Sequence, residues 1–424
     1  MATPPPHTDP ANAVKRATLG LSLGALPAVI GPGLLAGLSD DDPAGITTYS
    51  VLGADHGYQL LWVLLLATAA LVLFHGLAAR MGVVTGQGLI GLVRQRYGVR
   101  VGGATLAALV VANIGTTCAE FAGIAAGSEL FGISRYAGVP AAAAMVSLLV
   151  LRGSFHRVEH FLLVLSTVFL AYVASGVLAH PDWGAAVHGL LVPSMPTNAA
   201  AIEIVTATVG TTLAPWGLSF IQSYAVDKKL RTEDLSLERL DVITGAVLTG
   251  VIGFFVVVAC AATLHRSGRS IRDAADAAVA LQPLAGGAAS TLFGIGLIGA
   301  ALLAASVLPL STAYSLCEYV GTEAAVDDSF TDARPFYLTF GFVTLVGALA
   351  VLLPNIPLVT ILVATQVLNA VLLAPLLIAM IGIARDRDLM GRFTIGWAGT
   401  VAYGVTTAVV LLCVAALAVT TFTG

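Results

Sequence analysis

The chain has 424 residues, of which 57% are apolar and only 10% are charged, and its mean hydropathy is +0.92. A soluble domain has about 25% charged residues, so this composition excludes a water-soluble protein and is typical of a bundle of membrane-spanning helices. The net charge of −4, with no long tract of Lys or Arg, argues against nucleic acid as a partner. The four cysteines stand singly in apolar runs, which favours neither disulfides nor a CxxC metal site.

Apolar stretches follow one another along almost the whole chain. Residues 1–16 are polar and rich in proline, and we predict that they form a disordered cytosolic tail. A window of about 19 residues then finds about eleven hydrophobic spans. Their limits are 18–54, 59–80, 102–130, 138–152, 158–179, 199–225, 240–264, 288–321, 335–353, 356–383 and 394–422. The hydrophilic loops between them, of which the longest are 180–198, 226–239 and 322–334, are too short to form a domain.

The basic residues indicate how the chain is oriented in the membrane. If the N-terminus is cytoplasmic, 16 of the 20 Lys and Arg residues lie on the cytoplasmic side. The positive-inside rule favours this orientation, and an odd number of spans then puts the C-terminus outside. We predict a multi-pass protein of a bacterial inner membrane, with a short amphipathic helix over residues 85–100 at the cytoplasmic interface. The four residues left outside are Arg135, Arg266, Arg269 and Arg272.

The first span contains three consecutive aspartates, Asp40 to Asp42, followed by Pro43 and Gly45. A helix cannot continue undisturbed through this proline, and the glycine relaxes the backbone further. Carboxylates inside a membrane are costly, so three of them at a helix break predict a cation site. The alternative is a surface loop with solvated acids. The apolar stretches on either side of the break, however, are each too short to cross the membrane alone.

The sixth span has a similar interruption, in which Pro215 and Gly217 repeat the Pro-x-Gly pattern. Two broken helices in corresponding places predict a secondary transporter built from inverted repeats, with its site near the middle of the membrane. Backbone carbonyls near Thr211 and Ala214 would then join the aspartates around a cation. An ordinary proline kink is the alternative for this break taken alone.

These two breaks divide the chain into predicted units. We expect a transporter core over residues 17–383, in which 17–180 and 199–383 are two inverted repeats of five helices. Residues 394–422 form an additional eleventh helix in this interpretation.

Other polar residues inside the apolar spans have two interpretations each. Glu120 is either a buried proton acceptor or a hydrogen-bonding link between helices. Gln366 and Asn369 share one helix face, and they either line a cavity or bond to a neighbouring helix. Glu318 lies near the predicted cytoplasmic end of its span, which favours a solvated cap over a site.

Taken together, these motifs resemble the Nramp family of divalent-metal transporters over residues 15 to 420. The resemblance implies an all-α polytopic membrane protein with a LeuT-like fold, about 11 transmembrane helices in two inverted repeats of five, and broken first and sixth helices. It also implies transport of Mn²⁺ or Fe²⁺, usually with protons. The motifs that carry it are Gly31-Pro32-Gly33 with Asp42-Pro43, Thr116-x-x-Ala119-Glu120, Thr211-x-x-Ala214-Pro215 and Gln366-Val367-Leu368-Asn369.

The sequence departs from the family pattern at three places. The family has Asp-Pro-Gly-Asn in its first helix, where this chain keeps Asp42 but has Gly45 in place of the asparagine. The family's Met-Pro-His in the sixth helix becomes Ala214-Pro215-Trp216, and an aspartate of the third helix becomes Thr117, three residues before Glu120. The pattern resembles the Nramp-related magnesium transporters, a branch that shares the changes to alanine and tryptophan and that is thought not to couple to protons.

The absence of the family's methionine and asparagine has a direct chemical meaning. A thioether is a soft ligand that suits transition metals, whereas Mg²⁺ prefers oxygen ligands and keeps several waters. We therefore expect a transporter that imports Mg²⁺, with Mn²⁺ as a second substrate, by alternating access and without protons. We expect its partners to be the cation and the lipid bilayer, and we expect no obligate protein partner. We also expect no enzyme activity and no cofactor.

The predicted site has two groups of residues. The metal ligands are Asp42 as the principal one, Asp41 and Gln366 directly or through water, backbone groups of Thr211 and Ala214, and the space left at Gly45. The second group lines the cavity or forms a possible proton route and comprises Trp216, Thr117, Glu120 and Asn369. Three alternatives remain open: a proton-coupled Mn²⁺ or Fe²⁺ importer, a carrier of amino acids or other organic solutes on the same fold, and a metal-binding membrane sensor.

Overall fold

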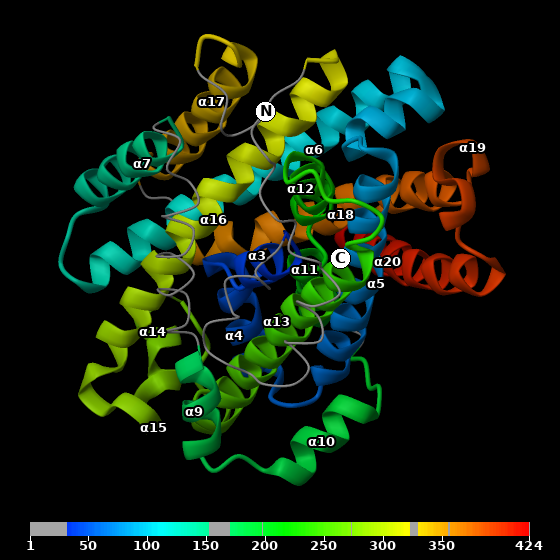
Figure 1. The fold of residues 1–424 in the computed structure, drawn as a ribbon. Helices are drawn as coiled ribbons and strands as arrows, with labels where there is room; N and C mark the ends of the chain where they lie inside the picture. The colour runs from blue at the N-terminus through cyan, green and yellow to red at the C-terminus, as the bar shows by residue number, and fades with distance from the viewer. Residues whose placement is uncertain are drawn as a thin grey trace, which may run out of the picture.

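The structure is a computed structural model that describes residues 32–151, 170–196, 198–272, 274–322, 330–354 and 357–423. Within these ranges the chain forms helices and connecting turns, with no strand (Figure 1). Eight helical stretches there are long and apolar enough to cross a membrane. The predicted tail 1–16, the start of the first span and most of the fifth span lie outside the described residues.

Most of the long helices agree with the predicted spans to within about five residues, whereas the helix of the third span begins at Leu89, well before the predicted 102. The first span consists of two short helices, α3 and α4, and the sixth consists of α11 and α12. The main helices are α3 (Pro32–Asp40), α4 (Pro43–His56), α5 (Leu61–Thr85), α6 (Leu89–Leu130), α7 (Arg135–Leu151), α9 (Leu170–Leu178), α11 (Ala199–Thr212), α12 (Pro215–Asp227), α13 (Leu235–Thr263), α16 (Ala289–Val320), α17 (Arg334–Val351), α18 (Leu358–Ala384) and α20 (Trp397–Thr423).

Short helices lie in three of the connections. The loop predicted over 180–198 contains α10 (Trp183–Leu191), which begins because the Asp182 side chain accepts a hydrogen bond from the Ala185 N–H at 2.9 Å. The remaining short elements are η2 (His265–Ser267), α14 (Ala274–Ala278), η3 (Val279–Leu281), α15 (Gln282–Ala285), η4 (Gly286–Ala288), α19 (Arg387–Met390) and η5 (Gly391–Phe393).

The amphipathic segment predicted over 85–100 begins later than expected. Thr85 is the last residue of α5, and Gly86 ends that helix in the left-handed conformation at φ 64°. The new helix starts at Leu89 as the first part of α6, whose only non-helical residue is Gly98 at φ 86°. Leu89, Ile90, Leu92 and Val93 are buried, so the first turns of this segment pack against the bundle.

The half-helix α3 is held tightly against α13. Gly33 and Gly37 lie one turn apart and both meet Gly245, so the two backbones approach closely. The N–H of Gly33 donates to the carboxylate of Asp241 at 2.7 Å, and the hydroxyl of Thr249 donates to the carbonyl of Gly37 at 2.5 Å. These contacts fix the end of α3 that leads to the three aspartates.

The two broken helices occupy the middle of the bundle. In Figure 1, α3, α4 and α11 lie at the centre, whereas α20 lies at the edge. The most apolar part of the α11–α12 stretch is entirely buried, while that of α20 is mostly exposed. Both breaks are therefore enclosed by other helices, and the polar groups at them are removed from bulk solvent.

Candidate metal centre

The first break is a helix end followed at once by a new helix start. Asp42 has an extended backbone (φ −76°, ψ 171°) and caps α4, because its Oδ1 accepts a hydrogen bond from the N–H of Gly45 at 2.5 Å. Pro43 takes the first helical position, where a missing N–H costs nothing. Asp40, Asp41 and Asp42 are only 1%, 1% and 3% exposed, so the surface-loop alternative is wrong.

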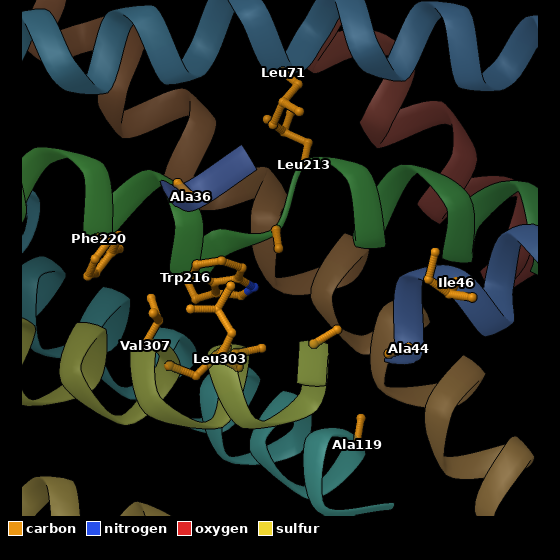
Figure 2. Packing of buried hydrophobic residues seen from close by; sticks show 14 of the residues in the cluster. Ala36, Ala44, Ile46, Leu71, Ala119, Leu213, Trp216, Phe220, Leu303 and Val307 are labelled. Carbon is orange, nitrogen blue, oxygen red and sulfur yellow. The ribbon is translucent and has the colours of Figure 1, made fainter. Parts of the chain in front are cut away.

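The second break lies directly beside the first. α11 ends at Thr212, Leu213 and Ala214 leave the helical conformation, and Pro215 begins α12. The hydroxyl of Tyr49 on α4 bonds to that of Thr212 at 2.8 Å, which ties the two broken helices together. Figure 2 shows the chain crossing from α11 through Leu213 to α12, with α4 alongside.

Three oxygen atoms converge on the point where a side chain at Gly45 would begin, which we call the position above Gly45. A Cβ atom at this glycine would lie 2.6 Å from the carbonyl oxygen of Asp40, 3.2 Å from Oδ1 of Asp42 and 3.2 Å from Oγ1 of Thr211. The Thr211 hydroxyl and the Asp41 carboxylate have no hydrogen-bond partner within the described part of the chain. Oxygen atoms from a carboxylate, a carbonyl and a hydroxyl are the donors that hard divalent cations prefer.

The site is not a preformed cluster of ionisable ligands. Within the ranges given above, no group of three or more His, Cys, Asp or Glu side chains is arranged to hold a metal ion. A cation here would therefore need backbone and hydroxyl oxygens and water in addition to carboxylates. Such a ligand set suits a transported ion, which must bind and then be released, since several of its ligands would be water.

Glu120 and Thr117, the two predicted positions of the proton route, face different neighbours. Glu120 on α6 is fully buried, and its carboxylate lies close enough to that of Asp42 for the two groups to interact. Thr117 is turned toward α17, where its methyl group lies against Gly347. Of these two residues, Glu120 is therefore the one that lies beside the aspartates at the break.

Asn369 connects α18 to α6. Its amide donates to Oγ1 of Thr116 at 3.0 Å and to Oε1 of Gln366 at 2.9 Å, so it matches the interhelical alternative. The carbonyl oxygen of Gln366 lies against Gly210 of α11, in a contact too close for any side chain at that glycine. Gln366 thus lies at the junction of α18 and α11, and its amide is engaged with Asn369.

Ala214 and Trp216 lie at the start of α12. The carbonyl of Ala214 accepts a hydrogen bond from the N–H of Gly217 at 3.2 Å. The indole of Trp216 is buried, and Figure 2 shows it beside Leu303 and Val307 of α16. The role of Trp216 as a cavity wall stays a prediction.

Glu318 is a helix cap, as the sequence favoured, but it is partly buried and the helix that it caps is not its own. Its carboxylate accepts hydrogen bonds from the hydroxyl of Ser223 on α12 and from the N–H of Ile90 at 3.3 Å. It caps the start of α6, a helix that is distant in sequence, which no local pattern could indicate. Nearby, the Gln222 amide donates to the carbonyl of Gln87 at 2.9 Å. These bonds join α12, α16 and the start of α6, and they close one end of the bundle.

A cavity of about 350 Å³ lies toward the opposite end of the bundle. It is lined by Thr47, two residues beyond Gly45, and by Leu362 of α18, and it reaches Glu129, Arg135 and Arg272. Glu129 and Arg135 form an ion pair at 2.7 Å. We call this cavity the vestibule. The structure therefore combines an opening near the break on one side with a hydrogen-bonded closure on the other.

One ionisable residue near the breaks was missed in the sequence. His75 of α5 is 0% exposed, and neither of its ring nitrogens has a hydrogen-bond partner among the described residues. The available signal was its position inside the apolar span 59–80, since ionisable residues within membrane spans are usually functional.

Two adjacent helix breaks with buried carboxylates, inside an apolar bundle, define a membrane transporter of the broken-helix class. Residues 33–420 match the family model described as natural resistance-associated macrophage protein-like, or Nramp. The chain belongs to the Nramp family, as its motifs predicted, and it is a transporter and not an enzyme.

Bacterial relatives cover most of the chain. A divalent metal cation transporter MntH from Burkholderia ambifaria is 29% identical over 417 residues, which are 95% of this chain and 91% of the relative. A protein of the same name from Granulibacter bethesdensis is 30% identical over 377 residues, or 86% of this chain and 82% of the relative.

Two solved structures have the same fold at low sequence identity. The manganese transporter of Eremococcus coleocola, in complex with an aromatic bis-isothiourea substituted compound, has a TM-score of 0.74 at 19% identity and covers 93% of this chain and 87% of its own. Mhp1, a transporter of the nucleobase-cation-symport-1 family, has a TM-score of 0.58 at 16% identity and covers 93% of each chain. The predicted all-α, polytopic, LeuT-like fold is confirmed.

Proposed function

We propose that this protein imports a divalent metal cation by alternating access, with Mg²⁺ as the main substrate and Mn²⁺ as the second, and without coupling to protons. The observation that carries the proposal is the convergence of three oxygen atoms above Gly45 at the first helix break. The family and the names of the MntH relatives support a divalent metal as the substrate.

In this proposal Asp42 is the principal ligand, through its buried carboxylate. Thr211 contributes its hydroxyl, and Asp41 contributes negative charge directly or through water, since neither group has a hydrogen-bond partner in the described ranges. The proposal also gives Ala214 a backbone role and Gln366 a direct or water-mediated one. Hard cations of this size keep part of their hydration shell, so water would complete the coordination in this proposal.

The distribution of basic residues supports an orientation for the two ends of the bundle. With the N-terminus cytoplasmic and the C-terminus outside, Arg135 and Arg272 mark the outer face of a bacterial plasma membrane. The vestibule between them then opens outward, and the closure at Glu318 faces the cytoplasm. We further propose that residues 17–180 and 199–383 are the inverted repeats whose relative movement opens the inner side.

The preference for Mg²⁺ is based on what the site lacks. No thioether is present at Ala214, and the Gly45 position has no room for the family's asparagine, because a Cβ atom there would meet the carbonyl of Asp40 at 2.6 Å. The available donors are oxygens, which favour Mg²⁺ over softer metals.

A second candidate is a proton-coupled Mn²⁺ or Fe²⁺ importer. Glu120 favours it, because a buried acid beside the principal ligand can exchange a proton when the cation arrives. The relatives' names are compatible with both candidates.

The test is uptake of Mg²⁺, Mn²⁺ and Ca²⁺ by the purified full chain in liposomes. We expect uptake of Mg²⁺ that Mn²⁺ inhibits, driven by an inside-negative potential. The absence of uptake of any divalent cation, from protein that remains folded, would overturn the proposal.

Selectivity provides the first prediction. Ala214→Met introduces a soft thioether at the start of α12, so we expect Mn²⁺ or Cd²⁺ uptake to gain relative to Mg²⁺ by about tenfold, which corresponds to about 1.4 kcal/mol. Competition uptake in liposomes measures the ratio, with Ala214→Leu as a control of similar size but without sulfur. An equal change in both variants would show that side-chain volume, and not the thioether, sets the preference.

Coupling provides the second prediction. Trp216 and Thr117 cannot carry a proton, so we expect Mg²⁺ uptake to leave the pH inside the liposomes unchanged. A pH-sensitive dye inside the vesicles measures it, with a protonophore added as a positive control for acidification. Metal-dependent acidification that disappears in Glu120→Gln would replace the uncoupled mechanism with the proton-coupled candidate.

A further inference from the structure

Two buried ionisable groups near the breaks have no partner. Asp40 is 1% exposed and His75 is 0% exposed, and neither the carboxylate oxygens nor the ring nitrogens have a hydrogen-bond partner within the described residues. Buried polar groups in native proteins are nearly always satisfied, so an unpartnered acid and an unpartnered imidazole in one region require an explanation. A ligand that binds both groups provides one.

Gly217 shows that the two groups border one small space. A Cβ atom at this glycine would lie 3.1 Å from Nε2 of His75 and 3.8 Å from Oδ1 of Asp40. Because glycine has no side chain, the point that both polar atoms approach stays free. Any other residue at position 217 would place a carbon atom there.

The helix α5 positions the imidazole at the second break. Figure 2 shows Leu71 of α5 pointing at Leu213, in the link between α11 and α12. His75 follows Leu71 by four residues, so the two side chains lie on the same face of α5. The face that packs on the break therefore carries His75 one turn further along, beside the first turn of α12.

Asp40 lies at both the Gly45 position and the Gly217 position. Its carbonyl oxygen is one of the three oxygens above Gly45, whereas its carboxylate lies beside Gly217 and His75. A cation bound at Asp42 is thus two residues along the chain from a second set of donors. Asp40 ends α3, before the first break, and Gly217 lies in the first turn of α12, after the second break. The vestibule is reached instead from Thr47 of α4, so these donors lie on the opposite side of the breaks.

We propose, on the basis of the function proposed above, that His75 and Asp40 form a second binding position for the transported cation, between the Asp42 position and the closed inner end. Its donors are one imidazole nitrogen and one carboxylate, completed by water. An imidazole suits Mn²⁺, Fe²⁺ and Zn²⁺ and contributes little to Mg²⁺. His75 therefore supplies the softer donor that Ala214 lacks, and it determines how well the protein accepts Mn²⁺.

The experiment uses Mn²⁺ itself as the probe, added to the purified full chain in lipid nanodiscs. Pulsed electron paramagnetic resonance detects the ¹⁴N modulation of an imidazole bound directly to Mn²⁺. We expect this modulation in the unchanged protein, its loss in His75→Gln, and its loss in Gly217→Ala, where a methyl group fills the space. His265→Gln is the matched control, because the His265 ring instead bonds to the carbonyl of Ala54 at 2.9 Å, and we expect it to keep the modulation.

Uptake in liposomes supplies the second measurement. In His75→Gln we expect Mn²⁺ uptake to fall by about tenfold relative to Mg²⁺ uptake, a loss of about 1.4 kcal/mol. An equal fall for both ions would identify His75 as a structural residue and overturn the second position. Mn²⁺ that binds in an Asp42-dependent manner without ¹⁴N modulation would also overturn it, while leaving the proposed transport function intact. The absence of Mn²⁺ binding in protein that still takes up Mg²⁺ would overturn the second position as well, whereas the absence of uptake of any divalent cation would reject the transport function.

Discussion

Asp42→Asn is expected to reduce uptake of Mg²⁺ and Mn²⁺ to the background of empty liposomes. The carboxylate of Asp42 is buried at the break and is the principal ligand in the proposed site, so removing its charge takes away the main compensation for the cation in a region of low dielectric. Asparagine caps a helix as well as aspartate does, so the hydrogen bond from the N–H of Gly45 is kept and α4 still begins at Pro43. Uptake and thermal unfolding are measured on the same preparations.

Asp42→Ala separates the two roles of this residue. It removes the charge and the cap together, so we expect the same loss of uptake and an additional loss of stability of about 1 kcal/mol. Asp55→Asn is the control, because this acid lies exposed near the other end of α4 and its replacement should leave uptake unchanged. Wild-type uptake by Asp42→Asn would exclude Asp42 as the principal ligand.

The parts of the fold that depend on local chemistry could be predicted from the sequence. Apolar runs of sufficient length must be helices within a membrane, and most of their ends agree with the structure to within about five residues. Pro43 and Pro215 interrupt their helices because each lacks an N–H and each begins a new helix at its first position. The caps Asp42 and Asp182 follow from the same local rules.

The parts that depend on neighbours distant in sequence could not be predicted. Nothing around Glu318 indicates that it caps α6, and nothing around Thr117 indicates that it faces α17. The directions of Asp40 and Asp42 also could not be derived, because helical spacing does not apply across a break. Only the packing of α5 and α12 places His75 beside Asp40.

The inner closure indicates which elements must move during transport. Glu318 and Ser223 link α16 to α12, and Gln222 links α12 to Gln87 just before α6. The half-helix α3 is fastened to α13 through Asp241. An inward opening of the proposed kind must therefore break the polar bonds of α12, while α3 and α13 move as one unit because their backbones are packed too closely to slide.

Gly45→Ala is expected to reduce Mg²⁺ uptake by at least about tenfold, a loss of about 1.4 kcal/mol, although it changes no charge and removes no ligand. The added methyl group would lie 2.6 Å from the carbonyl oxygen of Asp40 and 3.2 Å from the oxygens of Asp42 and Thr211, so it occupies the space assigned to the cation and its water. Thr211→Val removes one of these oxygens without adding an atom, and we expect a weaker apparent affinity for Mg²⁺ from it as well.

The control for Gly45→Ala is Gly341→Ala in α17, where an added Cβ atom meets nothing within 4 Å. Alanine is favoured over glycine inside a helix by about 1 kcal/mol, so this control should keep full uptake and unfold at an equal or higher temperature. Thermal unfolding is measured on the same preparations, and a lower unfolding temperature is expected for Gly45→Ala, because the added methyl group must displace the backbone carbonyl of Asp40. Thr211→Val adds no atom, so its effect on Mg²⁺ affinity separates the loss of a ligand oxygen from a displaced backbone. If Gly45→Ala and Thr211→Val both transport Mg²⁺ with unchanged affinity and rate, the oxygens above Gly45 do not form the cation site. The buried groups of Glu120 and His75 would then be the remaining candidates for its ligands.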